Sequence, residues 1–188
     1  MLITFNFGVQ LLVDLLSAGF VDRIGYRVSV VMAHAFSVIG LVGLAFLPDL
    51  LPDAFAGLLL SVILYGIGGG LIEVLVSPIV ESCPSENKEK AMSLLHSFYC
   101  WGHVLVVLIS TIYFKIFGIE NWKILTLLWA MVPLINGILF CKAPIASLVE
   151  EGEEGMSVGM LCRNRLFWIL MLMMLCAGAS EQGVSQWA

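Results

Sequence analysis

The chain has 188 residues, of which 60% are hydrophobic and only 12% are charged, and its formal net charge is −5. Soluble domains carry charge on roughly a quarter of their residues, so this composition excludes an ordinary soluble protein and indicates an integral membrane protein. The nine basic residues form no run, which argues against nucleic acid as a partner. The five cysteines form no CxxC pair and their number is odd, so neither a disulfide framework nor a zinc site is indicated and we predict free thiols. No cofactor is predicted.

Six apolar segments separated by short polar breaks follow one another along the chain. Lipid offers the backbone no hydrogen-bond partners, so each segment is expected to be helical. Residues 28–47 run for twenty positions without a charged side chain, which at about 1.5 Å per residue spans roughly the 30 Å hydrocarbon core of a bilayer. The sequence therefore predicts an all-α, polytopic transmembrane helix bundle, with helices at residues 2–21, 28–47, 54–80, 91–114, 124–141 and from 166 onward.

Basic residues are distributed unevenly between alternate loops. One side carries only Lys115 and Lys123, whereas the other carries seven basic residues: Arg23, Arg27, Lys88, Lys90, Lys142, Arg163 and Arg165. Short cytoplasmic loops are enriched in Lys and Arg, so the second side is predicted to be cytoplasmic. The connection "PDLLPD" (48–53) is then external, and the acidic loop at 143–165 is internal.

The loop after the first segment reads "SAGFVDRIGYRVSV". Asp22, Arg23, Gly25 and Arg27 resemble the D-R-x-G-x-[RK] motif of the loop that joins helices two and three in the major facilitator superfamily. Glycine permits a sharp turn, and the arginines can meet cytoplasmic water or lipid phosphate. The acidic inner loop then falls where that family joins its two six-helix halves. Two positions depart from the family pattern, Ala18, which is still small enough for close packing, and Tyr26. The tyrosine leaves open which of Arg23 and Arg27 pairs with Glu81.

This resemblance implies a major-facilitator-type bundle that is incomplete. Residues 1–142 would form five transmembrane helices of the N-terminal half, 143–165 the cytoplasmic loop between the halves, and 166–188 the start of the first helix of the C-terminal half. Met1 opens directly into an apolar segment and Ala188 ends inside another, so we expect a piece of a larger transporter, with the remainder of its chain as a partner.

Polar residues recur on one face of three segments, at spacings typical of a helix. Ionisable groups that face lipid are costly, so each stripe is expected to face a cavity or a neighbouring helix, and together the stripes would line one path for water. The stripes are Asn6, Gln10, Asp14 and Ser17 in the first segment, Gly69, Glu73, Ser77 and Glu81 in the third, and Ser93, His96, Cys100, His103 and Ser110 in the fourth.

Glu73 is the sole charge between Ala54 and Val80. Burial penalises the ionised form of a carboxyl group, so a buried glutamate would hold a proton near neutral pH and release it when water arrives. That chemistry suits proton-coupled transport, and a purely structural hydrogen bond is the alternative. Asp14, about two turns from the cytoplasmic loop, is a second candidate.

Two other groups of residues have structural and functional interpretations. The ligand types of His96, Cys100 and His103 share one face and could bind a metal, but no acidic partner on the same helix completes the set. The glycines at residues 66–70 favour close helix contact, because no strand precedes them as a phosphate-binding loop requires.

Part of the sequence is similar to fucose-permease-like sugar symporters. The acid of the third segment, the "SP" step after it and "LLHSF" carry this similarity, although Ser77 stands where asparagine is usual. "GASEQGVSQW" is similar to the helix-seven pattern of that family, which implies an acid and sugar contacts there. The candidate proton-coupling or substrate residues are Glu73, Asp14, Glu181, His96, Gln10, Gln182, Gln186 and Trp187, and the conformational loop motif comprises Asp22, Arg23, Gly25, Arg27 and Glu81.

The sequence thus predicts a secondary active transporter at the cell membrane that moves a small polar solute, a sugar by the resemblance, through proton-coupled alternating access. A drug or metabolite exporter of the same superfamily and a non-transporting, truncated membrane protein are the alternatives. An enzyme is not predicted, because no HExxH, GxSxG or two-aspartate helix motif appears.

Overall fold

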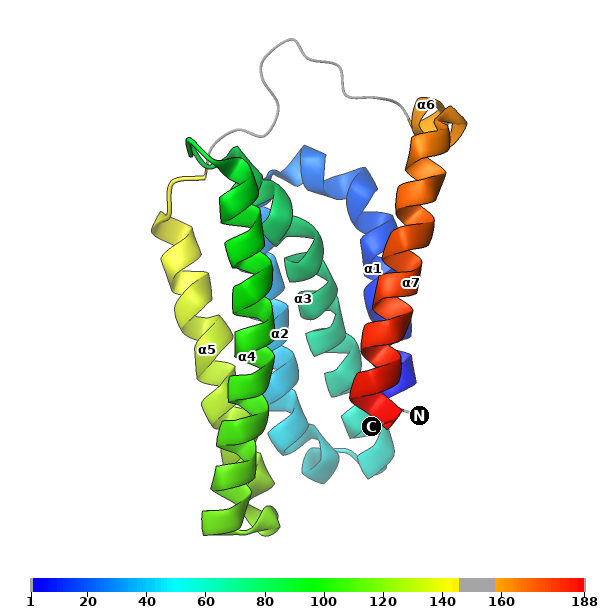
Figure 1. Ribbon diagram of the computed structural model, residues 1–188. Coiled ribbons are helices and arrows are strands. Elements are labelled where there is room, and N and C mark those ends of the chain that lie inside the picture. The colour runs from blue at the N-terminus through cyan, green and yellow to red at the C-terminus, as the bar shows by residue number, and fades with distance from the viewer. Residues whose placement is uncertain (1, 146–157, 188) are drawn as a thin grey trace. The chain divides into compact units, whose positions relative to one another are not determined.

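The computed structural model describes residues 2–145 and 158–187, and every element in this part of the chain is a helix. The prediction of an all-α chain is confirmed. Two compact units are present, residues 1–148 and residues 149–188. The elements in chain order are α1 (Leu2–Ile24), α2 (Tyr26–Leu50), α3 (Ala54–Ser82), α4 (Lys88–Phe117), the 3-10 turn η1 (Ile119–Asn121), α5 (Trp122–Lys142), α6 (Val158–Arg163) and α7 (Arg165–Trp187) (Figure 1).

Four segments of the described chain are long and apolar enough to cross a membrane. They are α2, α3, α4 and the stretch Ile119–Lys142, which joins η1 to α5. The helices α1 and α7 contain shorter apolar stretches, Leu2–Ser17 and Arg165–Ser180. All six predicted segments are therefore helices, and the membrane crossing of α1 and α7 stays a prediction.

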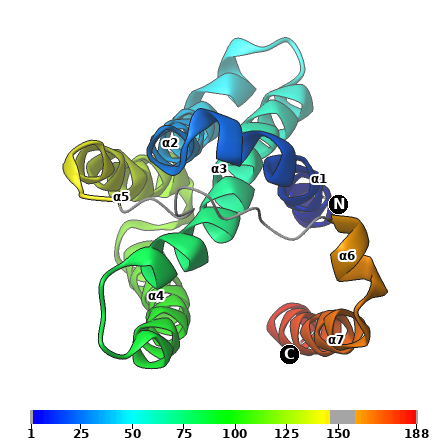
Figure 2. The same cartoon turned by 90° about the horizontal axis from the view of Figure 1, so that it is seen from above.

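In the first unit, α2 and α3 form the centre. The helix α1 packs against α3 and α5 packs against α2, while α4 makes smaller contacts with α3 and α5. Figure 2 shows α5, α2, α3 and α1 side by side in that order. The buried apolar core lies mainly between α2 and α3, and includes Val30, Ala33, Leu71, Leu75 and Ile79.

Glycines bring α2 and α3 into direct backbone contact. A Cβ atom on Gly40 would lie 2.3 Å from the backbone nitrogen of Tyr65, and one on Gly68 would lie 2.6 Å from the carbonyl oxygen of Ala33. Real Cβ atoms essentially never approach this closely, and a backbone atom cannot swing away as a side chain can. Only glycine fits at these positions, so α2 and α3 form a fixed pair. The predicted role of Gly68 in close helix packing is confirmed.

Charged contacts join α5 to α2 near both helix ends. Arg27 Nη1 donates a hydrogen bond of 2.8 Å to the carbonyl oxygen of Cys141. The last carbonyls of a helix carry partial negative charge, so a cation is favourable there. Lys123 at the start of α5 forms an ion pair with Asp49 near the end of α2. These contacts hold α5 in register with α2.

A single residue, Gly25, joins α1 to α2. Its φ of 90° and ψ of 148° lie where L side chains rarely go. The turn is held locally, because the Gly25 amide donates to the Val21 carbonyl at 2.9 Å. The amide and hydroxyl of Ser29 donate to the Gly25 carbonyl at 3.1 and 2.9 Å. The sharp glycine turn predicted for the "DRIGYR" loop is confirmed.

The second unit comprises α6 and α7. Asn164 separates the two helices, and its side-chain oxygen accepts a hydrogen bond of 2.9 Å from the amide of Leu166, which caps α7. The indole of Trp168 donates to the carbonyl oxygen of Cys162 at 2.8 Å and so ties α7 to α6. The short helix α6 lies inside the segment predicted as a linker between halves, and the proposed division of the chain into halves stays a prediction.

Candidate functional site

The polar stripe of α1 lies directly on a stripe of glycines on α3. Glycine leaves room for these polar tips, so the two stripes fit each other. The prediction that the α1 stripe faces a neighbouring helix is confirmed at these three positions. Measured from the position that a glycine Cβ would take, the contacts are 2.8 Å from Gly66 to Asn6 Oδ1, 3.0 Å from Gly69 to Gln10 Nε2 and 3.3 Å from Gly70 to Asp14 Oδ1.

Two oxygens of this stripe are buried without a hydrogen-bond donor. Asn6 Oδ1 and Asp14 Oδ1 are closed off from solvent, and no described residue donates to either. Ser17 lies nearby, but its hydroxyl donates to the main-chain oxygen of Asp14 at 2.7 Å. Leaving a buried acceptor unsatisfied costs about 1–3 kcal/mol, which makes such an atom a place to look for function.

Glu73 is exposed, so the expectation that it is buried is wrong. It follows Gly66 by seven residues and therefore lies on the same side of α3, the side that meets α1. Glu73 is therefore exposed on the side of α3 that meets α1.

The polar stripe of α4 is mostly exposed, because α4 buries no residue. No group of three or more His, Cys, Asp or Glu that could hold a metal ion, His96, Cys100 and His103 included, occurs among the described residues. Ser110 is the member of the stripe that meets a neighbouring helix, since the indole of Trp129 on α5 donates to its hydroxyl at 3.1 Å. The expectation that this stripe faces a cavity or a helix is thus met at Ser110.

The conformational loop motif contacts the end of α5 and, within the described part of the chain, does not form the ion pair with Glu81 that the sequence suggests. Arg27 bonds to the end of α5, and no ion pair joins the exposed Glu81 to Arg23 or Arg27 among the described side chains. The side chain of Asp22 lies outside the described residues.

The acid and the sugar contacts predicted in α7 fall on residues whose side chains the structure does not describe. Their backbone belongs to α7, while their side chains lie outside the described residues. Their roles stay predictions. These residues are Glu181, Gln182, Gln186 and Trp187.

Asn6 contacts Gly66 but is not among the candidate site residues chosen from the sequence. The spacing of Asn6 from Gln10 places both on one face, but only the register of α1 against α3 shows that Asn6 meets Gly66. A stripe of glycines on one helix and a stripe of polar residues on another is a usable signal once the two are known to be neighbours.

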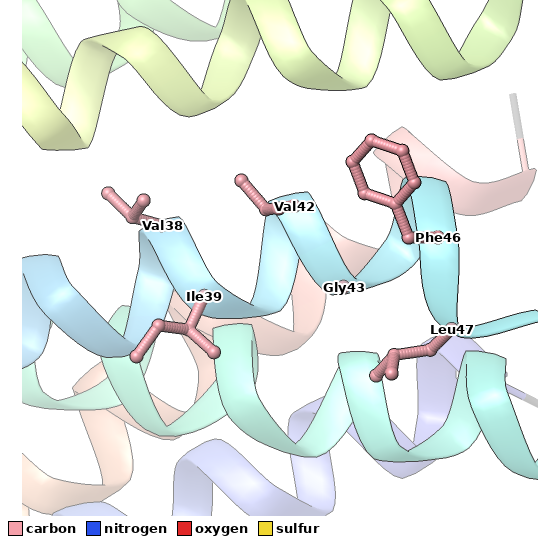
Figure 3. Close-up of a pocket in the computed structure, with 6 residues that line it drawn as sticks. All are labelled: Val38, Ile39, Val42, Gly43, Phe46 and Leu47. Carbon is pink, nitrogen blue, oxygen red and sulfur yellow. The ribbon is translucent and has the colours of Figure 1, made fainter. Parts of the chain in front are cut away.

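A pocket of about 350 Å³ lies on α2, away from this polar contact. In Figure 3, Val38, Val42 and Phe46 point to one side, Ile39 and Leu47 point to the other, and Gly43 leaves a gap between them. These side chains are all apolar and offer no hydrogen bond to a polar solute. The pocket therefore forms no part of the candidate site.

A bundle of long apolar helices with a partly buried polar interface defines a multi-pass helical membrane protein. The family model of the Major Facilitator Superfamily matches residues 1–188, and the chain belongs to this superfamily. It is a family of transporters rather than enzymes, whose partners are a small-molecule substrate and the lipid bilayer. Comparisons with curated proteins and with solved structures found no match. The resemblance in the "DRIGYR" loop is thereby confirmed for the superfamily, and the fucose-permease branch stays a prediction.

Proposed function

We propose that this chain forms part of a secondary active transporter of the cell membrane that moves a small polar solute, a sugar, together with protons. In such transporters two halves rock about a site near the middle of the bilayer and open it to one side at a time. The remainder of the chain would supply the other helices. Membership of the superfamily supports the transport of a solute, and the polar helix faces support its polar character.

The observation that carries proton coupling is the carboxyl group of Asp14. One of its oxygens is closed off against Gly70 without a donor. Asp14 is only partly buried, but an ionised carboxylate loses the hydration of this one oxygen without compensation, whereas the neutral acid loses less. A group that packs when protonated and needs water when ionised has the chemistry of a coupling site. Glu73, one turn beyond Gly70 on α3, is the second carboxyl group at this interface.

The choice of a sugar rests on sequence similarity and on the residue types. The "LLHSF" run and the "SP" step support a sugar symporter, and Gln10, Gln182 and Gln186 supply amide groups suited to sugar hydroxyls. Trp187 would supply the apolar face on which a sugar ring can stack. His96 is an exposed polar residue of α4 that would line the same path.

The test compares uphill accumulation with exchange in proteoliposomes that contain the complete protein and a labelled monosaccharide. We expect Glu73→Gln and Asp14→Asn to abolish accumulation driven by a pH gradient while exchange of internal for external sugar continues, because neither amide can cycle a proton. Glu120→Gln, at an exposed position in η1, is the matched control and should accumulate sugar normally.

Two outcomes would contradict this proposal. Uphill accumulation with a normal pH profile in both variants would remove proton coupling at these residues. Uptake that falls only in step with the amount of folded protein would assign both side chains a structural role.

A further inference from the structure

We infer that α1 parts from the glycine stripe of α3 when Asp14 loses its proton, so that this single helix contact couples protonation to movement inside the bundle. The inference rests on the proposed function and adds to it the moving element and the surface on which it moves. The moving element is α1, and the surface consists of Gly66, Gly69 and Gly70.

The closed contact leaves two acceptor oxygens unsatisfied. Asn6 Oδ1 and Asp14 Oδ1 receive no hydrogen bond from the described residues while α1 lies on α3. Water would supply donors to both oxygens as soon as the helices part. The penalty is larger for a charged carboxylate than for a neutral acid, so ionisation of Asp14 shifts the balance toward the open arrangement.

The helices α2, α3 and α5 are held together by backbone and charged contacts. A Cβ on Gly40 or Gly68 would strike backbone atoms of the opposite helix, so α2 and α3 touch along their main chains. The bond from Arg27 to the end of α5 and the ion pair of Asp49 with Lys123 hold α5 on α2. The stretch of α1 from Asn6 to Asp14 lies on the glycines of α3, where a Cβ on Gly70 would also lie 3.2 Å from Gln10 Cα. Val21, nearer the end of α1, belongs to the buried apolar core, so the parting concerns the stretch from Asn6 to Asp14.

Asp14 and Glu73 differ in their exposure, and the other titratable groups of α1 and α3 lie elsewhere on these helices. Glu73 lies on the α1 side of α3 but is exposed, so ionisation costs it less desolvation. Tyr65 packs against α2, and Glu81 lies two turns nearer the end of α3. On α1 itself, Asp22 and Arg23 lie in the last turn.

The helix α2 also touches α1, and its titratable groups are engaged elsewhere or lie at its ends. His34 donates to the carbonyl oxygen of Val30 through Nδ1 at 2.7 Å, and its ring lies 5.3 Å from the ring of Phe140 on α5. Arg27 and Asp49 contact α5, as described above. Tyr26 is the first residue of α2, in the turn that follows Gly25.

The predicted dependence on pH has a definite sign. At low pH the carboxyl group of Asp14 is neutral and α1 rests on α3. As the pH rises the carboxyl group ionises, and the open arrangement, in which water reaches it, becomes populated. Asn in place of Asp14 stays neutral at every pH and should hold the contact closed.

A pair of cysteines can report the contact without any substrate. A Cβ on Gly66 would lie 3.4 Å from Val9 Cβ and 3.2 Å from Val9 Cγ1, close to the spacing that a disulfide spans, so Val9→Cys with Gly66→Cys joins α1 to α3. Gly43→Cys with Ser61→Cys is the matched control between α2 and α3, because a Cβ on Gly43 would lie 3.2 Å from Ser61 Oγ. Both pairs are made in the complete protein after replacement of the native thiols, which include the five free cysteines of this chain.

The yield of the α1–α3 disulfide is divided by that of the control pair, which cancels the effect of pH on thiol oxidation. From about pH 5 to about pH 9, a range that covers documented buried carboxyl groups, we expect this ratio to fall about fivefold or more. The ratio should stay constant in Asp14→Asn, and it should keep its pH dependence in Glu73→Gln. A constant ratio with Asp14 present, a pH dependence that survives Asp14→Asn, or one that is lost in Glu73→Gln would overturn the inference.

A second measurement tests the inference if the protein with Val9→Cys and Gly66→Cys does not fold. A side chain at Gly69 would meet only the flexible amide end of Gln10, so Gly69→Cys is a mild change. Its labelling by N-ethylmaleimide, relative to that of the exposed Cys100, should rise about fivefold or more over the same pH range and stay low in Asp14→Asn. Labelling that does not rise overturns the inference. Neither measurement needs transport. Failure of the unmodified complete protein to accumulate sugar along a pH gradient would therefore contradict the proposed function and leave this inference standing.

Discussion

Gly25 holds a backbone conformation that no other residue adopts without strain. No atom lies within 4 Å of the place where its Cβ would be, so crowding is not the obstacle and the positive φ is. We expect Gly25→Ala and Gly25→Val to lower the free energy of unfolding by about 1–3 kcal/mol, the usual cost of such backbone strain. Thermal unfolding of the purified protein in detergent measures this loss.

The matched control is Gly19→Ala in α1. Gly19 also has open space around its Cβ position, but its backbone is helical. Alanine there should leave stability unchanged or raise it by up to about 1 kcal/mol, because alanine is the better helix former. If Gly25→Ala unfolds at the same temperature as the unmodified protein and transports fully, the "DRIGYR" turn has no special conformational role.

The sequence predicts which residues share a helix face, but not how deep each side chain lies. Glu73 is isolated among apolar residues, which predicts burial, yet it is exposed. Asp14, in a more polar segment, has the closed-off oxygen. Depth depends on which helix covers a face, and helical periodicity carries no information on that.

At the scale of elements, α2 and α3 depend on glycines with no room for a methyl group. A Cβ on Gly68 would lie 2.2 Å from Ser37 Oγ and 2.6 Å from the carbonyl oxygen of Ala33. We expect Gly68→Ala to force the helices apart and to lower the free energy of unfolding by about 1–3 kcal/mol, as overpacking of a core usually does. Gly102→Ala on α4, where no atom lies within 4 Å, is the control and should not destabilise the protein. Equal stability of the two variants would contradict the backbone contact.

The apolar runs predict where helices lie, because a membrane segment must satisfy its own backbone. They do not predict the helix ends. The helix α4 begins at Lys88, three residues before its apolar run, because Asn87 accepts a hydrogen bond of 3.0 Å from the amide of Lys90. The short helices η1 and α6 have too few residues to show a period, so the sequence gives no sign of them.

At the scale of the whole molecule, the loop motif predicts the superfamily, which the family model confirms, and the loop charges predict an orientation that stays a prediction. The order α5, α2, α3, α1 required the structure. Neighbours in the sequence do not always pack together, since α1 packs chiefly on α3 rather than on α2. Contacts between helices depend on the shapes of their surfaces, here glycine against polar tips, and such fits involve residues far apart in the chain.

The orientation of the bundle gives the last prediction. The helix α2 ends at Leu50 and Asp53 caps α3, so a tag inserted between Leu51 and Pro52 leaves both helix ends intact. Because α3 is long enough to span the membrane, this loop and the exposed Glu89 in the first turn of α4 should face opposite sides. The excess of basic residues assigns the Glu89 side to the cytoplasm. We expect antibodies to reach the tag on intact cells, and a maleimide to label Glu89→Cys, in a background without other thiols, only after the membrane is permeabilised. The reverse pattern would invert the topology and with it the register of the loop motif, and equal access to both positions would mean that α3 does not cross the membrane.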